Sequence, residues 1–219
     1  MRAMPFLSPS KTVTMKDKYL ILTAKALSLL FTPFYFPVLA FVALFSFSYL
    51  KLLPFTYQLI ILAMVYVFTV LLPLFTIYLY RRINGWTRHQ LGHRQKRVMP
   101  YLLSITSYGC CLYLMHRLHM PRFMMGIIVA ALSIQVVCAV VNGFIKVSTH
   151  SAAAGGVIGA LLAFSAIFAF DPTFWLCLSI LMAGAVGSSR IILRQHNLHE
   201  IGLGVTIGFF CGLLSILLV

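Results

Sequence analysis

The sequence predicts an all-α protein, a polytopic bundle of transmembrane helices with six or seven spans. Hydrophobic residues make up 61% of the 219 positions, charged residues make up 9%, and the mean hydropathy is +0.98. About a quarter of the residues of a soluble domain are charged. Apolar runs of about 20 residues recur along the chain, and each is long enough to cross a hydrocarbon core about 30 Å thick. Lipid is therefore the expected solvent of most of the chain.

Apolar runs bounded by charge, proline or glycine define the expected helices. The first run contains Pro33 and Pro37. Because proline kinks a helix, we expect either a kinked span or a segment that returns to the side it entered. No repeat or linker divides the chain, so residues 1–219 are expected to form a single domain with a polar N-terminal segment, 1–25. The expected spans are residues 26–50, 56–80, 99–116, 122–142, 151–170, 173–190 and 200–218.

The formal net charge of +14 comes from 17 Lys and Arg against three acidic residues. Most of the basic residues stand in short gaps between apolar runs, where contact with headgroups and control of topology are common roles, so nucleic acid is not an expected partner. Arg81, Arg82, Arg88 and Lys96 are interpreted as such anchors. The five cysteines lie in apolar runs without a CxxC pair, which favours core packing over a disulfide framework or a thiolate metal site.

Polar side chains are expected to gather on one side of the bilayer. Two crossings separate each of the segments 81–98, 143–150 and 190–200 from the next, so all three lie on the same side. The gaps between the other spans are shorter and hold fewer ionisable residues. Any chemistry therefore belongs to the side of these three segments.

Two stretches on that side carry the candidate site. Lys146, Ser148 and His150 precede a run of small residues, which lets a neighbouring helix pack closely. His196 and Glu200 stand four residues apart, so on a helix they share a face, and the carboxylate can bond one imidazole nitrogen while the other acts as nucleophile or base. Nearby cations suit phosphoryl transfer, because they neutralise oxygens that gain charge in the transition state. The expected phosphate clamp is Arg97, Lys146 and Arg190.

These stretches resemble the signature of the phosphatidic acid phosphatase type 2 superfamily of membrane phosphatases, which is related to the vanadium haloperoxidases. The third element of the signature, SRx5Hx3D, is matched in every spacing from Ser189 to Glu200, with Glu in place of Asp. The extra methylene displaces the carboxylate by up to ~1.5 Å, and such a misplacement can cost about 100-fold in rate. The resemblance covers mainly residues 81–205.

The other two elements are matched less well. In the second, PSGH, the chain keeps Ser148 and His150 but has neither the Pro nor the Gly. In the first, Kx6RP, Arg97 stands three residues before Pro100, and Gln90 stands where the Lys is expected. Lys146 or Arg94 is the expected substitute for that Lys.

The resemblance implies a mechanism and a role for each site residue. His196 attacks phosphorus and forms a phosphohistidine, Glu200 orients this histidine, and His150 protonates the leaving group. Covalent catalysis by histidine together with arginine clamping makes a metal unnecessary, so neither a metal nor another cofactor is expected. The implied phosphate-binding residues are Arg97, Lys146, Ser148 and Arg190, with Arg94, Thr149 and Ser189 as additional candidates.

The expected protein is thus an enzyme, a lipid phosphatase that removes a phosphate monoester or diphosphate from a membrane lipid headgroup. Its expected partners are this lipid substrate and the bilayer. One alternative is a lipid-phosphate binder or carrier without turnover, which the eroded first and second elements motivate. A minor alternative is a histidine-box di-metal oxygenase, suggested by the histidine pairs His89 and His93, His116 and His119, and His196 and His199.

The expected location is a multi-pass position in a bacterial cytoplasmic (inner) membrane, and the resemblance implies an outward-facing site. The charge distribution depends on residues 26–50. If they cross fully, the site side holds 14 Lys and Arg against 3, and the positive-inside rule places the site in the cytoplasm. If they return to the side they entered, the numbers are 9 and 8. Without the three site residues Arg97, Lys146 and Arg190 the numbers become 6 and 8, which agrees with an outward-facing site.

Overall fold

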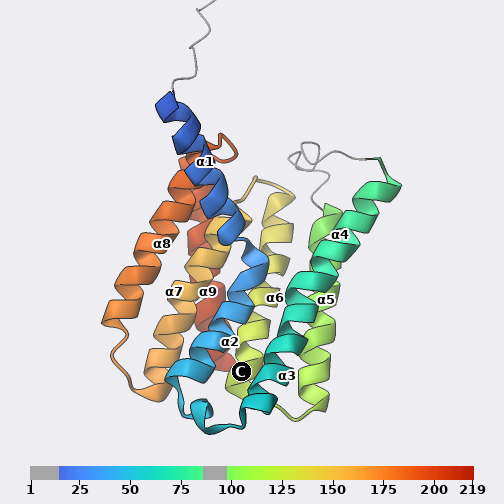
Figure 1. Cartoon of the computed structure of the whole chain (residues 1–219), viewed down its shortest axis with the longest axis vertical. Coiled ribbons are helices and arrows are strands. Elements are labelled where there is room, and N and C mark those ends of the chain that lie inside the picture. The colour runs from blue at the N-terminus through green and yellow to red at the C-terminus, as the bar shows by residue number, and fades with distance from the viewer. Residues whose placement is uncertain (1–14, 86–97) are drawn as a thin grey trace, which may run out of the picture.

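The chain folds into a bundle of long helices that run roughly along one axis (Figure 1), in a computed structural model that describes residues 15–85 and 98–219. Seven helical segments within these residues are long and apolar enough to cross a membrane. The prediction of an all-α polytopic bundle is confirmed, and within the described residues seven helical segments, rather than six, are suitable spans. These spans are Lys18–Ser46, Phe55–Ile83, Val98–Arg117, Arg122–Asn142, Thr149–Phe168, Thr173–Ile192 and Leu198–Leu218.

Two helices in line make the first span. α1 (Met15–Leu30) and α2 (Phe36–Phe47) are separated by a short 3₁₀ turn that begins at Pro33, and together they run from one end of the bundle to the other (Figure 1). The proline interrupts the helix, as expected, but the segment does not return to the side it entered. α1 also begins earlier than the expected residue 26. A long lysine side chain such as that of Lys25 can extend away from an apolar helix, so it does not end the span.

Later helices alternate in direction along the bundle. We call the end where α4, α6 and α8 finish and α5, α7 and α9 begin the polar end, and the opposite end the distal end (Figure 1). α1 begins beyond the polar end. The remaining elements are a 3₁₀ turn (Tyr49–Leu52), α3 (Phe55–Tyr66), a π turn (Val67–Leu71), α4 (Leu72–Ile83), α5 (Val98–Arg117), α6 (Arg122–Asn142), α7 (Thr149–Phe168), α8 (Thr173–Ile192) and α9 (Leu198–Leu218).

The π turn joins α3 and α4 in the middle of the second span and leaves two carbonyl groups without helical donors. The wider turn bypasses the carbonyl of Phe68, and Pro73 has no N–H to offer the carbonyl of Thr69. Ser107 of α5 donates to the first of these carbonyls, and the hydroxyl of Tyr108 lies 3.5 Å from the second. Backbone groups in lipid need such partners, so these bonds attach α5 to the second span.

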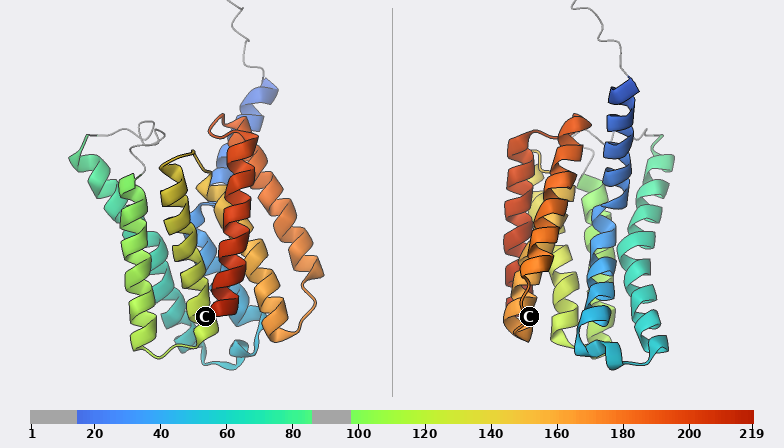
Figure 2. Two further views of the ribbon diagram at one scale, coloured as in Figure 1. Left: turned by 180° about the vertical axis from the view of Figure 1, so that it is seen from behind. Right: turned by 60° about the vertical axis from the view of Figure 1, so that its left-hand side comes forward.

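The most extensive contact between two helices is that of α7 with α9, which lie side by side (Figure 2). Glycines remove the side chains that would separate the two backbones. A Cβ atom built on Gly204 would lie 2.6 Å from the carbonyl oxygen of Ser148, and a Cβ on Gly208 would overlap the carbonyl group of Ala152. Such close approach is how helices gain packing energy in lipid. The glycines of α9 that contact α7 in this way are Gly204, Gly208 and Gly212.

We expect Gly208→Ala to destabilise the bundle by about 2 kcal/mol, because the methyl group forces α7 and α9 apart. Gly202→Ala is the matched control on the same helix, since a Cβ there meets no atom within 4 Å. Alanine favours a helix over glycine by up to ~1 kcal/mol, so this variant should match or exceed the stability of the parent chain. Thermal unfolding in detergent measures both. Equal midpoints for the two variants would contradict the proposed role of the contact.

Candidate functional site

The polar end brings together the N-termini of α7 and α9 and the C-terminus of α8. The backbone N–H of Ser148, which caps α7, donates to the carbonyl of Glu200 in the first turn of α9, at 3.3 Å. The glycine contact between these helices ends at the same point, because Gly204 lies against Ser148. The segments 143–150 and 190–200, predicted to lie on one side, therefore meet.

His196 and Glu200 form the central pair of the site. Nδ1 of the imidazole lies 2.6 Å from Oε2 of the carboxylate. The contact predicted from the spacing is confirmed, but the two residues do not share a helix, because α9 begins at Leu198 and His196 lies in the turn before it. The longer side chain of Glu200 is accommodated by this geometry. The histidine side chain is only 1% exposed, so the ring is held in one orientation.

Lys146 joins this pair from the turn before α7. Its Nζ donates to the carbonyl of Gln195 at 2.6 Å and lies 3.8 Å from Oε2 of Glu200. The carboxylate of Glu200 thus lies between an imidazole and an ammonium group. Because a partly buried charge needs partners, this arrangement stabilises the carboxylate and fixes the lysine at the site. The salt bridges of Glu200 are thus with His196 and Lys146, and the neighbouring His199 is exposed.

Ser148 has a structural role that the sequence did not indicate. Its hydroxyl accepts from the backbone N–H of Ser151 at 3.3 Å and lies 2.9 Å from the Ser151 hydroxyl. Both serines are fully buried. This is the geometry of a helix N-cap. Thr149 and His150 follow as the first two residues of α7, and both are half-buried.

Arg190 lies in the last turn of α8 and is 9% exposed. Its Nη1 donates to the hydroxyl of Ser28 in α1 at 2.6 Å. Ser28 belongs to the part of the chain outside the predicted motifs, and no signal in the sequence pointed to it. The hydroxyl of Ser189, an additional candidate, donates within its own helix to the carbonyl of Val186.

The turn between α8 and α9 sets the distance from Arg190 to His196. Gln195 donates its backbone N–H to the carbonyl of Arg190 at 3.0 Å, and Arg194 donates to the carbonyl of Ile191 at 2.9 Å. Arg194 has a left-handed backbone, with φ of 51°. These features define a Schellman motif, which ends α8 and turns the chain within a few residues.

The remaining predicted residues of the first motif lie outside the described residues. Arg94 and Arg97 belong to the segment 86–97, and so do Arg88 and Lys96. Arg81 and Arg82 form the last turn of α4 at the polar end, in agreement with a role as headgroup anchors.

The electrostatics of the polar end favour an anionic ligand. The N-terminus of a helix carries a partial positive charge, and α7 and α9 both begin here. Lys146 and Arg190 add full positive charges. Glu200 offsets part of this field, but it is engaged by His196 and Lys146. An anion such as phosphate has the charge that this field attracts.

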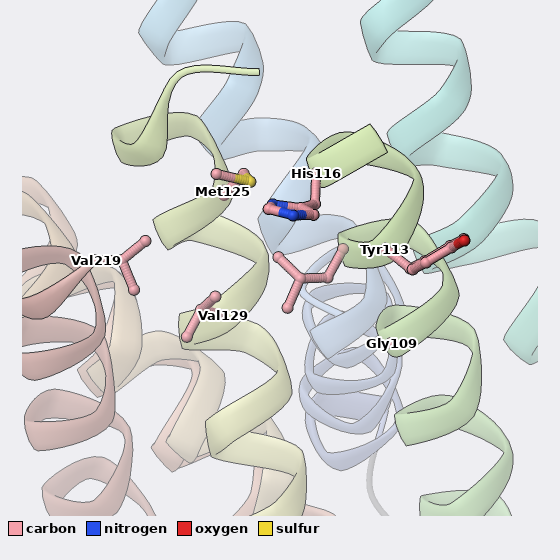
Figure 3. Close-up of a pocket in the computed structure, with 7 residues that line it drawn as sticks. Gly109, Tyr113, His116, Met125, Val129 and Val219 are labelled. Atoms are coloured by element: carbon pink, nitrogen blue, oxygen red, sulfur yellow. The ribbon is translucent and has the colours of Figure 1, made fainter. Parts of the chain in front are cut away.

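The described residues do not support a histidine box. They contain no group of three His, Cys, Asp or Glu side chains placed to hold a metal ion. His116 lies near the distal end of α5, far along the bundle from His196, and His89 and His93 lie outside the described residues. Figure 3 shows His116 and Met125 on the two sides of a pocket. The pocket has a volume of about 400 Å³, and its other lining residues are Gly109, Leu112, Tyr113, Val129 and Val219.

Comparison of the chain with known protein families, with curated proteins and with solved structures finds no match. A function for the polar end is therefore argued from the residues of this chain and their geometry.

Proposed function

We propose that the chain is a membrane phosphatase that hydrolyses a phosphate monoester or diphosphate at the headgroup of a lipid. The contact of His196 with Glu200, with Lys146 beside them, carries the proposal. A carboxylate on Nδ1 sets the tautomer of a histidine so that its Nε2 presents a lone pair, and it stabilises the positive charge that the ring gains on attack. This is the arrangement that a histidine nucleophile requires.

The proposed reaction has two steps. In the first, Nε2 of His196 forms a bond to phosphorus while the bond from phosphorus to the leaving oxygen breaks, and His150 gives a proton to that oxygen. In the second, His150 takes a proton from water, the water oxygen bonds to phosphorus, and the bond between phosphorus and His196 breaks. The products are a lipid alcohol, or a lipid monophosphate from a diphosphate, and inorganic phosphate.

Cations hold the phosphate during both steps in this proposal. Arg190 offers a planar guanidinium that can form paired hydrogen bonds, and Lys146 offers a point charge. Arg97 and Arg94 are proposed to complete the clamp, with the first turn of α7 at Thr149. The positive charge of this set would stabilise the oxygens of the transferring phosphoryl group, which is the main source of rate in phosphoryl transfer.

A lipid-phosphate binder or carrier is the second candidate. It is favoured by Ser148, whose hydroxyl caps α7, and by the 1% exposure of the His196 side chain. Both candidate functions require the cations to bind phosphate, and they differ in whether His196 reacts with it. Removing the imidazole therefore separates them.

We expect His196→Ala to lower phosphate release by at least ~1000-fold, because it removes the imidazole that forms the covalent intermediate. His199→Ala is the matched control, since His199 is an exposed histidine three residues away, and it should keep the parent activity. The assay uses purified full-length protein with phosphatidate, phosphatidylglycerophosphate, an isoprenoid diphosphate and a phosphorylated lipid A. Orthovanadate, which mimics five-coordinate phosphorus, should inhibit the active protein.

Two results would contradict this prediction. Activity that survives in His196→Ala would exclude His196 as the nucleophile. Failure of the parent chain to release phosphate from all four lipids, while it still binds them, would favour the binder.

We expect Glu200→Asp to lower kcat by about 100-fold, although aspartate is the residue of the resembled family. The Glu200 carboxylate lies 2.6 Å from His196 in the present geometry. Removing a methylene withdraws it by up to ~1.5 Å, and a misplacement of about this size can have that cost. Steady-state kinetics of Glu200→Asp and Glu200→Gln measure the effect. A faster Glu200→Asp enzyme would show that the site was built around the shorter side chain.

The proposed location is the cytoplasmic (inner) membrane of a bacterium, with the site at the cytoplasmic face. Because the first span runs the full length of the bundle, the start of α1 and the site belong to the same end. By sequence position this end has 14 of the 17 Lys and Arg. Without Arg97, Lys146 and Arg190 it still has 11 against 3, and the positive-inside rule favours the cytoplasm. This proposal replaces the outward-facing site that the resemblance implies.

We expect a cysteine at position 88, in a chain without native cysteines, to react with a membrane-impermeant maleimide only when the cytoplasmic face is exposed. Leu118→Cys in the distal turn is the matched control and should react from the outer face, because Leu118 is 54% exposed. Labelling intact and permeabilised cells distinguishes the two positions. The reverse pattern would place the site at the outer face.

A further inference from the structure

We infer that Ser28 is a positioning residue of the site, which holds the guanidinium of Arg190 in the orientation that grips phosphate. The inference rests on the proposed function. It makes α1 part of the site, although α1 lies 162 positions earlier in the sequence than the residue it contacts.

The contact joins two helices through a short hydrogen bond. Nη1 of Arg190 lies 2.6 Å from Oγ of Ser28, and the arginine is 9% exposed. α8 is the helix with which α1 makes its most extensive contact. Ala24, four residues before Ser28, is only 2% exposed, so both residues lie on the face of α1 that is packed against the bundle.

Ser28 differs from the other described serine and threonine residues of the first span. Serine and threonine in helices usually donate to a carbonyl of their own preceding turn. Thr23, Thr32 and Ser46 do so, at Leu20, Leu29 and Val42 respectively. Ser28 instead accepts a hydrogen bond from another helix. Local helix geometry does not explain this bond, whereas a need to orient Arg190 does.

Because the partner of Arg190 is a neutral hydroxyl, Ser28 can position the guanidinium but cannot neutralise its charge. A guanidinium has five N–H donors, and a hydroxyl acceptor occupies one of them. A hydroxyl carries no charge, so the full positive charge stays with Arg190. A carboxylate partner would occupy two donors and compete with phosphate for the charge. An arginine side chain loses rotamer entropy when it binds a ligand, so a fixed orientation before the substrate arrives favours phosphate recognition.

The test compares Ser28→Ala with Ser28→Thr and with Thr23→Ala, the matched control on an exposed turn of the same helix. We expect Ser28→Ala to lower kcat/KM on the active lipid phosphate by about tenfold and to weaken orthovanadate inhibition similarly, as for loss of a hydrogen bond to a charged group. Ser28→Thr, which keeps the hydroxyl, should restore most of both. Thr23→Ala should match the parent chain, and Ser28→Thr should share its thermal midpoint.

A double-mutant cycle separates positioning from a general effect on α1. In an Arg190→Met background Ser28→Ala should have less than about a twofold further effect on kcat/KM or on orthovanadate binding, because the group it orients is gone. The inference would be overturned if Ser28→Ala lowered kcat/KM by the same factor with Arg190 present and with Arg190→Met. It would also be overturned if Ser28→Ala kept the kcat/KM and the orthovanadate inhibition of the parent chain. A parent chain that binds orthovanadate without turnover still tests Ser28 through affinity. A parent chain that neither turns over nor binds orthovanadate overturns the proposed function as well.

Discussion

The close packing of α7 against α9 is the constraint on which the polar end depends. In lipid, apolar side chains gain little by meeting one another, so helices associate where small residues let their backbones approach. Gly204 and Gly208 allow this approach, and the contact runs up to Ser148. The N-termini of α7 and α9 are thereby held side by side. The backbone bond from Ser148 to Glu200 and the salt bridge from Lys146 to Glu200 both follow from that register.

A second constraint is electrostatic. Two helix N-termini and several cations at one end would repel each other if no anion were present. Glu200 supplies a negative charge at that point, and it does so through groups that phosphoryl chemistry would use, His196 and Lys146. A bound phosphate would add the charge that this end lacks. The same features that stabilise the folded end therefore favour an anionic ligand, which links the fold to the proposed reaction.

Much of the arrangement could be predicted because lipid imposes simple rules on a sequence. The length of an apolar run sets a span, and the parity of spans sets the side of each loop. These rules correctly placed Lys146 and Glu200 at the same end. They did not place the start of α1, because Lys25 interrupts the apolar run in the sequence but not in the helix. Nor did they reveal that Ser148 caps α7, since a serine can serve a helix or a ligand equally well.

The sequence by itself determined the all-α membrane fold, the gathering of charge at one end and the contact between His196 and Glu200, because each depends on composition or on a spacing of a few residues. Only the tertiary structure decided that the first span crosses the whole bundle and that Ser28 meets Arg190. The reason is physical: a contact between residues 162 positions apart depends on how whole helices pack. That packing depends on many interhelical contacts at once, and no local sequence pattern predicts it.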